Sequence, residues 1–448
     1  MSAPAFDRSS TAADAPARSR VLFLALTNNM GCERVIGEVA FHGADCAVLS
    51  PPGFYCTRTR FAHRRFTLPP QLDMWLANTV VHTALEILAR SWRPDLVVPL
   101  DDVAASILRG LAVSRRCSGV LRAALVRSLG DVRGYSASAS RAGFQQMADR
   151  IGVRIPASRS VASAGEALQA VSGWSWPVVV KVEGTCGGCG VSLAPDPARL
   201  GAAVTSGLGR NSRLRRFKSR MKRLVWLAAG HFQTASAGVQ VQRYVHGRPA
   251  MRTVACWQGQ ELDGISFLAE CVHPAPSGPS SVIRPLDHKE MAVASQRLVA
   301  ALGASGIVSF DFVIEDGTEH AYAIEMNPRP IGATHLGRLC GHDVCGALLR
   351  RLGWPTAASS LDLAPMPSAI AVFPKELERN PDSDWLSREG VLHDVPWDDP
   401  GLIGAYLDRL SEVHPGETPA IRRQLAATPP RIGGVGSREG LDPTYVPH

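Results

Sequence analysis

Three polar side chains interrupt apolar segments at spacings that could hold a divalent cation. They are Asp311, Glu325 and Asn327, and Arg329 follows two residues after the last of them. Residues two apart in a β-strand share a face, so Glu325, Asn327 and Arg329 are expected to point the same way. Carboxylate and amide oxygens are ligands for Mg²⁺, and a guanidinium group binds phosphate through its fork of donors. The pattern predicts a metal site beside a phosphate clamp, in preference to polar residues that merely end a strand.

Asp311 joins this site only if the two strands pair in a suitable register. A two-residue turn at Asp316-Gly317 would put Asp311 on the face opposite Glu325. A glycine-containing loop of three or five residues would instead pair Asp311 with Ala323. Both acids would then share a face, roughly 7 Å apart. An odd-length loop is therefore an expectation of the metal hypothesis.

A lysine inside an apolar strand marks a second candidate site. Lys181 lies in Val178–Val182, where its ammonium group is costly unless it meets an anion. The loop that follows is rich in glycine, which lets backbone N–H groups approach a bound anion closely. Its glycines are Gly184, Gly187, Gly188 and Gly190. The spacing fits neither the P-loop nor the dinucleotide fingerprint. It favours binding of nucleotide phosphates, and a flexible hairpin beside a solvated lysine remains the alternative.

The cysteines do not indicate a metal or disulfide framework. Cys186 and Cys189 form a C-x-x-C pair in the glycine-rich loop, but zinc would need two more ligands and no second C-x-x-C or H-x-x-x-H occurs. The other eight of the ten cysteines are scattered singly. This usage is typical of reduced thiols in a cytosolic chain. We therefore interpret the pair as small residues in a tight loop.

The elements before these motifs predict a parallel sheet. Val21–Leu26, Cys46–Leu49 and Leu96–Leu100 are apolar runs that alternate with helical segments, which is typical of α/β proteins. Ligands bind such sheets just beyond the carboxyl ends of the strands. The polar residues at those positions are Asn28, Asn29 and Asp102. Turn and helix-cap roles are the alternative for them.

Composition and charge exclude several classes of protein. The chain has 448 residues, 45% of them apolar and 20% charged, which excludes a disordered chain. No apolar run is long enough to span a bilayer, and Val21–Leu26 is too short for a secretory signal. We therefore expect a soluble, cytoplasmic protein. Its first residues, 1–19, read as a disordered tail.

The net charge of +8 belongs to a single segment. Arg210–Arg223 holds eight cations and no acid, and removing it leaves 40 basic against 40 acidic residues. A general nucleic-acid binder would spread its basic residues more widely, so no specific nucleic acid is expected. The apolar residues here recur at helical spacing and predict one apolar stripe. They are Leu214, Phe217, Met221 and Leu224. The cations recruit an acidic substrate or partner, dock on a membrane surface, or are simply solvated.

These motifs, in this order, resemble the ATP-grasp superfamily, the fold of D-alanine–D-alanine ligase, biotin carboxylase and the carbamoyl phosphate synthase large chain. The most specific match runs from Glu325 to Arg329 and resembles the family's E-x-N-x-R signature for metal and phosphate. Asp311 stands where the family has its first metal-binding residue. The resemblance implies Mg²⁺ or Mn²⁺ on Asp311, Glu325 and Asn327, with Arg329 as the clamp for an acylphosphate.

The resemblance also implies an ATP site. Lys181 is similar to the family's phosphate-binding lysine, with a catalytic role beside Arg329, and the glycine-rich loop to its mobile hairpin. Arg141 stands where most members have a first phosphate-binding lysine. The segment passing the adenine would be Gln242, Arg243, Tyr244 and Val245. Gln242 replaces a frequent glutamate, and Pro249 a frequent ribose-contacting acid, which puts nucleotide affinity and purine preference in doubt.

The implied reaction is ADP-forming ligation. A carboxylate would attack the γ-phosphate of ATP, and an amine would then attack the acylphosphate. We expect an amino acid or small peptide as substrate, with His335 and Arg284 as further candidates for contacting it. The alternatives are a carboxylase or carbamoyl-phosphate-type enzyme that uses bicarbonate, and a nucleotide-binding protein without turnover. The resemblance leaves room for a homodimer.

The expected fold is α/β with α+β character. The tail at 1–19 precedes an N-terminal parallel α/β domain at 20–138. The ATP-grasp domain is expected at 139–350, with a small lid subdomain at about 157–245. A C-terminal extension, 351–448, completes the chain. The basic segment falls within the lid range, so it is expected near the mouth of the active site.

Overall fold

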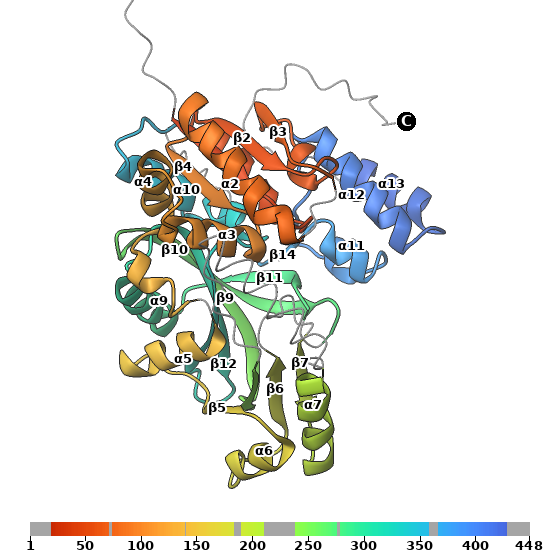
Figure 1. The fold of residues 1–448 in the computed structure, drawn as a ribbon. Coiled ribbons are helices and arrows are strands. Elements are labelled where there is room, and N and C mark those ends of the chain that lie inside the picture. Colours follow the sequence, from red (N-terminus) through yellow and green to blue (C-terminus); the bar gives the residue numbers. More distant parts are fainter. Residues whose placement is uncertain are drawn as a thin grey trace, which may run out of the picture.

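The computed structural model describes residues 19–70, 74–138, 140–182, 190–209, 238–275, 278–357 and 366–427 (Figure 1). Expectations for the N-terminal tail, for Gly184, Gly187 and Gly188, and for the basic segment Arg210–Arg223 concern residues outside these ranges and stay predictions. Within the ranges, no helix is both long enough and apolar enough to cross a membrane.

The chain begins with a four-stranded parallel sheet in the order β3-β2-β1-β4. Its strands are β1 (Arg20–Leu24), β2 (Asp45–Ser50), β3 (Arg64–Thr67) and β4 (Leu96–Pro99). Strands β1 and β4 are nearly continuous runs of buried apolar residues because helices cover both faces. One face carries α1 (Val35–Phe41), and the other carries α2 (Met74–Ser91), α3 (Asp102–Val113) and α4 (Gly119–Leu129). The predicted parallel α/β sheet is confirmed.

A larger sheet of seven strands follows, in the order β13-β12-β9-β10-β11-β14-β15. All its neighbouring strands are antiparallel except β14 and β15, which are parallel. The strands are β9 (Gly247–Trp257), β10 (Gln260–Val272), β11 (Ser280–Leu286), β12 (Gly306–Glu315), β13 (Ala321–Asn327), β14 (Ala369–Ala371) and β15 (Val391–His393). Helices α5 (Arg141–Arg150) and α9 (Lys289–Leu302) cover one face. The other face shares a core with β1, α1 and α10 (Val344–Arg351), so the two sheets are packed together.

The hairpin of β12 and β13 contradicts the expected odd-length loop. The amide of Glu315 bonds to the carbonyl of His320 at 2.9 Å, which leaves four residues, 316 to 319, in the loop. Phe312 pairs with Ala323, as an even loop requires, but Asp311 pairs with Glu325. A β-bulge at Ile324 therefore supplies the one-residue shift that we had assigned to the loop, and it places the two acids directly opposite each other.

A second, smaller antiparallel sheet has the order β5-β8-β6-β7. It comprises β5 (Ser158–Val161), β6 (Val178–Val182), β7 (Val191–Ala194) and β8 (Val239–Arg243), with helices α6 (Ala164–Ala170) and α7 (Pro197–Gly209) packed on it around a separate small core. Figure 1 shows this unit projecting beyond the end of the larger sheet.

The C-terminal elements lie against the N-terminal sheet (Figure 1). They include α11 (Lys375–Arg379), α12 (Pro400–Val413) and α13 (Thr418–Ala427). Asp399 accepts a hydrogen bond from the Arg60 amide at 3.1 Å and a short one from the Thr59 hydroxyl. Within the described ranges, short 3₁₀ turns connect the longer elements: η1 (Cys32–Arg34), η2 (Tyr55–Thr57), η3 (Val132–Gly134), η4 (Thr334–Leu336), η5 (Arg338–Cys340) and η6 (Asp384–Leu386).

Glycines let the end of α4 meet the start of β12 backbone to backbone. Gly130 forms an isolated β-bridge with Ala304. A Cβ atom on Gly306 would lie 2.4 Å from the carbonyl oxygen of Ser128, closer than real Cβ contacts come. Side chains at these glycines would force the N-terminal and larger sheets apart, so the close approach depends on their absence.

Candidate active site

The carboxylates of Asp311 and Glu325 face each other across the β12–β13 pair, and Asn327 lies beside them. Asn327 Nδ2 donates to Asp311 Oδ2 at 3.1 Å. Burial, and then the negative charge of Glu325, raise the pKa of Asp311 to about 7. A bound cation would relieve both effects, because it neutralises the facing carboxylates.

This donor set fits a hard divalent cation. It offers two carboxylates and one amide oxygen, the ligand types that Mg²⁺ and Mn²⁺ prefer. The described residues contain no cluster of three or more His, Cys, Asp or Glu that would form a different metal centre. Asp311, Glu325 and Asn327 are therefore the residues that would hold Mg²⁺.

Arg141 connects this carboxylate pair to the small sheet. Its Nε donates to Glu325 Oε2 at 2.8 Å, and its Nη1 donates to the carbonyl of Val182 at 3.0 Å. Ser140 caps α5 by accepting from the Gly143 amide at 3.0 Å, which fixes where the helix begins and so where Arg141 stands. The arginine thus bridges β13 and the strand that carries Lys181.

Lys181 is buried in β6, where it pairs with Val191 on one side and Gln240 on the other. Of the predicted loop glycines, the structure describes Gly190, whose carbonyl accepts from the Val182 amide at 2.8 Å. Val182, the neighbour of Lys181, therefore bonds to Gly190 through its amide and to Arg141 through its carbonyl.

The predicted adenine segment passes from the small sheet to the large one. Gln242 is buried and donates through Nε2 to Ser158 Oγ at 3.0 Å, so its amide nitrogen is engaged within the small sheet. Arg243 is exposed and reaches the Tyr322 hydroxyl at 3.4 Å. The ring of Tyr244 lies edge-on against His246, with 4.7 Å between centroids, and Val245 is buried.

Arg329 is held by the first residue of α3, the helix that follows β4. Its Nε and Nη2 donate to the two carboxylate oxygens of Asp102, at 2.8 and 3.0 Å. Its Nη1 reaches the Cys32 sulfur at 3.7 Å, and Nη2 reaches Asn327 Oδ1 at 3.5 Å. Arg329, Asn327 and Asp102, the first residue of α3, therefore come together at one point.

Known proteins resemble this chain in sequence and in fold. Residues 140–216 match the family model for the carbamoyl-phosphate synthase L chain, ATP binding domain. The carbamoyl phosphate synthase large chain of Rubrobacter xylanophilus is 26% identical over 266 residues, which is 55% of this chain and 22% of that protein. The chain thus spans about a fifth of the length of such relatives.

Two solved structures share the architecture. A biotin carboxylase from Campylobacter jejuni, in complex with an ATP analogue, superposes with a TM-score of 0.54 and 14% identity, covering 77% of this chain and 73% of that one. An L-amino acid ligase from Bacillus licheniformis gives 0.50 and 14%, covering 76% of each chain. The chain has the ATP-grasp fold. The resemblance to the ATP-grasp superfamily that the sequence indicated is confirmed at the level of fold.

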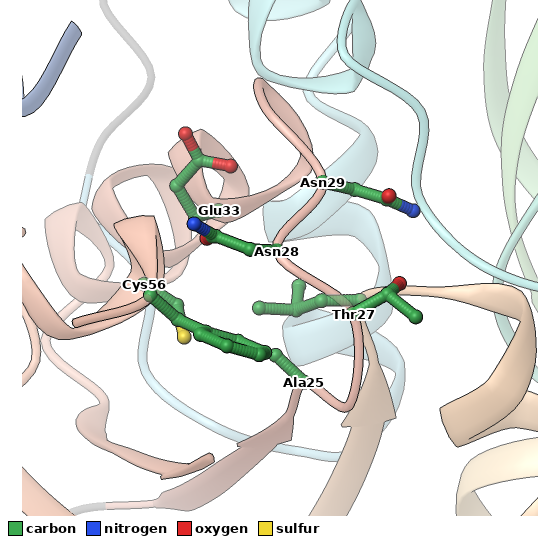
Figure 2. Close-up of a pocket in the computed structure, with 8 residues that line it drawn as sticks. Ala25, Thr27, Asn28, Asn29, Glu33 and Cys56 are labelled. Carbon is green, nitrogen blue, oxygen red and sulfur yellow. The ribbon is translucent and has the colours of Figure 1, made fainter. Parts of the chain in front are cut away.

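The ATP-grasp fold places a hollow at the carboxyl ends of β1, β2 and β4, where parallel sheets bind ligands (Figure 2). Its lining residues are Ala25, Thr27, Asn28, Asn29, Glu33, Phe54, Cys56 and Leu100. Asn28 and Asn29 were predicted to lie at this ligand-binding edge of the sheet. Their side chains point in opposite directions from the loop (Figure 2). Asn28 Oδ1 accepts from the Tyr55 amide at 2.8 Å, so it also shapes the wall of the hollow.

Sequence reasoning missed Glu33, which is 2% exposed. The Tyr406 hydroxyl, from the far end of the chain, donates a short hydrogen bond to its Oε1, while Oε2 has no hydrogen-bond partner among the described residues. Burial raises the pKa of Glu33. The sequence offered one signal, an acid between a predicted strand and a predicted helix. Acids in such positions are also common at the start of surface helices.

The two further substrate candidates have different settings. His335 is buried, its Nε2 lies 3.0 Å from Asp394 Oδ2, and its Nδ1 finds no partner in the described part of the chain. Asp394 also accepts a short hydrogen bond from Arg34, which follows Glu33. Arg284 instead pairs with Glu270 at 2.8 Å across the β10–β11 strands. The ATP-grasp fold therefore ties His335, and not Arg284, to the segment that contains Glu33.

Proposed function

We propose that this protein is an ATP- and Mg²⁺-dependent ligase that activates a carboxylate as an acylphosphate and joins it to an amine. The observation that carries the proposal is the facing pair Asp311 and Glu325, with Arg141 bonded to Glu325 and Arg329 four residues beyond it. The fold shared with an L-amino acid ligase and with a biotin carboxylase supports it.

Each residue has a role that its position allows. Asp311, Glu325 and Asn327 would hold Mg²⁺, which when bound neutralises charge on the phosphates. Lys181 and Arg141 add positive charge on the side of the small sheet. The substrate carboxylate oxygen attacks the γ-phosphorus of ATP. The bond between that phosphorus and the oxygen of the departing ADP breaks, and Arg329 stabilises the transferred phosphoryl group.

The second half-reaction releases phosphate. The amine nitrogen attacks the acyl carbon, the bond to phosphate breaks, and the nitrogen gives up its proton to solvent or a nearby base. Enclosure of the site protects the acylphosphate from water during this interval. We place the substrates between the hollow at the end of the N-terminal sheet and Arg329, because Cys32 touches Arg329 and Glu33 lines the hollow.

The test is ADP release with ATP and MgCl₂, screened over pairs of amino acids and small carboxylic acids. Release that requires both an acid and an amine supports the ligase. The matches to carbamoyl-phosphate synthase favour a second candidate, in which bicarbonate is the acid, so bicarbonate belongs in the same screen. ATP binding without ADP release in every combination would refute catalysis and leave a nucleotide-binding protein.

A further inference from the structure

Arg141 and a divalent cation would need the same carboxylate. Glu325 is one of the three residues proposed to hold Mg²⁺, and its Oε2 accepts a hydrogen bond from Arg141 Nε at 2.8 Å. The two form a salt bridge in which the arginine side chain is 10% exposed and the glutamate side chain 31%. Because water screens a partly buried pair only weakly, a cation that approaches Glu325 meets the positive charge of Arg141 at short range.

The other two proposed metal ligands are also engaged by protein groups. Asp311 Oδ2 accepts a hydrogen bond from Asn327 Nδ2 at 3.1 Å, and Asn327 Oδ1 accepts one from Arg329 Nη2 at 3.5 Å. The Asn327 amide thus turns its nitrogen, which is a donor and not a metal ligand, toward Asp311. Holding a cation with all three side chains therefore requires Asn327 to turn and Glu325 to be released from Arg141.

The position of Arg141 in its helix makes an anion necessary beside it. Arg141 is the first residue of α5, and the N-terminus of a helix carries partial positive charge. A guanidinium group there is unfavourable unless an anion lies opposite, and Glu325 supplies that anion. Phosphate oxygens suit both the guanidinium fork and the helix N-terminus, so they can replace the carboxylate as its partner. Lys181, which precedes the Val182 carbonyl that Arg141 also binds, lies on the side where the phosphates are proposed to bind.

We propose that Arg141 competes with the divalent cation for Glu325, so that Glu325 becomes available to the cation only when nucleotide phosphates bind Arg141. The inference rests on the proposed ligase, since it concerns the order of binding at that same site. With phosphates present, Arg141 exchanges its carboxylate partner for a phosphate oxygen and keeps its charge compensated. A cation alone offers Arg141 no new partner, and it would leave the guanidinium group beside a second positive charge.

The test measures metal binding without turnover. Mn²⁺ is titrated into the full-length, nucleotide-free protein at constant ionic strength and followed by electron paramagnetic resonance. We expect Arg141→Gln to bind Mn²⁺ about tenfold or more tightly than the wild type, because Glu325 loses the competing charge. Arg141→Lys keeps a positive charge and should return the Mn²⁺ affinity toward that of the wild type. A non-hydrolysable ATP analogue with Mg²⁺, followed by calorimetry, should bind Arg141→Gln about tenfold or more weakly.

The matched control is Arg150→Gln, because Arg150 is an exposed arginine at the other end of α5 and should leave both affinities unchanged. The double variant Arg141→Gln with Glu325→Gln should lose the gain in Mn²⁺ affinity, which locates that gain at Glu325. A merely structural role of Arg141 would weaken the binding of Mn²⁺ and of nucleotide alike. Equal or weaker Mn²⁺ binding by a cooperatively melting Arg141→Gln would overturn the proposal, and so would a gain that persists in the double variant.

If Arg141→Gln does not melt cooperatively, the wild type supplies the test. The Nε–H resonance of Arg141, assigned by its loss from Arg141→Lys, is followed by NMR of protein labelled with ¹⁵N in its arginines. It should move when Mg²⁺ and the ATP analogue are added together and stay in place with the same concentration of Mg²⁺ alone. Equal movement with Mg²⁺ alone would overturn the proposal.

The outcome separates this inference from the proposed function. ADP release that needs an acid and an amine, together with equal Mn²⁺ affinity of Arg141→Gln and the wild type, would leave the ligase standing and remove the competition. Tighter Mn²⁺ binding by Arg141→Gln, without ADP release from any pair of substrates, would do the reverse.

Discussion

Asp102, at the start of α3, accepts hydrogen bonds from Arg329 through both carboxylate oxygens, at 2.8 and 3.0 Å, and so holds the proposed clamp from the N-terminal domain. Asp102→Asn removes the charge but keeps the size of the side chain. We expect kcat for ADP release to fall about tenfold, because a charge-assisted hydrogen bond contributes roughly 1.5–3 kcal/mol. The KM for ATP should change little. Steady-state kinetics check this, with the exposed Asp149→Asn on α5 as control. A rise in the KM for ATP with unchanged kcat would contradict the positioning role.

Glu325→Gln should abolish the proposed chemistry without unfolding the protein. The amide cannot neutralise a divalent cation, so we expect ADP release to fall by at least about a hundredfold and Mn²⁺ binding, followed by electron paramagnetic resonance, to weaken. Glu315→Gln, at the other end of the same hairpin, is the matched control and should leave both unchanged. Substantial turnover in Glu325→Gln, with a cooperative thermal melt, would remove Glu325 from the metal site.

Lys181→Met keeps the aliphatic stem and removes the buried charge. We expect ATP to bind about tenfold or more weakly, measured by calorimetry in the presence of Mg²⁺, because the phosphates lose a cation. Lys289→Met, an exposed lysine at the start of α9, serves as control. ATP affinity equal to that of the wild type would exclude Lys181 from phosphate binding.

Tyr406→Phe tests the bond between the C-terminal helix α12 and Glu33. Loss of a donor to a buried carboxyl group costs about 1–3 kcal/mol, so the free energy of unfolding should fall by that amount. Tyr55→Phe is the matched control, since its ring lies 5.3 Å from that of Tyr406. Urea unfolding measures both variants. Equal stability of Tyr406→Phe and the wild type would mean that this bond adds nothing.

The burial of His393 should make the folded protein less stable in mild acid. Burial lowers the pKa of His393 to about 4, although the charges of Asp394 and Glu376 oppose the shift. The unfolded chain, with a pKa near 6.5, then binds more protons between about pH 6.5 and 4, so stability falls as pH drops through that window, by about 3 kcal/mol at most. Urea unfolding at several pH values should show a shallower fall for His393→Gln. The exposed His246→Gln should keep the wild-type slope, and identical slopes for all three proteins would exclude His393 as the cause.

Local patterns in the sequence predicted much of the fold. Alternating apolar and helical segments indicated the N-terminal parallel sheet, and period-two spacing put Glu325 and Asn327 on one face. Asp311 and Glu325 were expected to share a face two positions apart, but a β-bulge pairs them directly with each other. A bulge depends on packing across the sheet and leaves no clear mark in the residues of one strand, so loop length alone misjudged the register.

Contacts between distant segments could not be predicted. Glu33 and Tyr406 are 373 residues apart, and Asp102 and Arg329 are 227 apart. Sequence patterning shows which residues are buried, but it does not show which buried polar groups will meet.

The backbone contacts at Gly130 and Gly306 determine which parts of the molecule can move. With Ser128 and Ala304 pressed against these glycines, a rotation between the N-terminal and larger sheets would drive backbone atoms into one another. The small sheet has its own core and no such contact within the described residues. Movement that admits ATP or frees ADP is therefore expected on the Lys181 side, while the contact between the two larger sheets keeps a constant shape through the catalytic cycle.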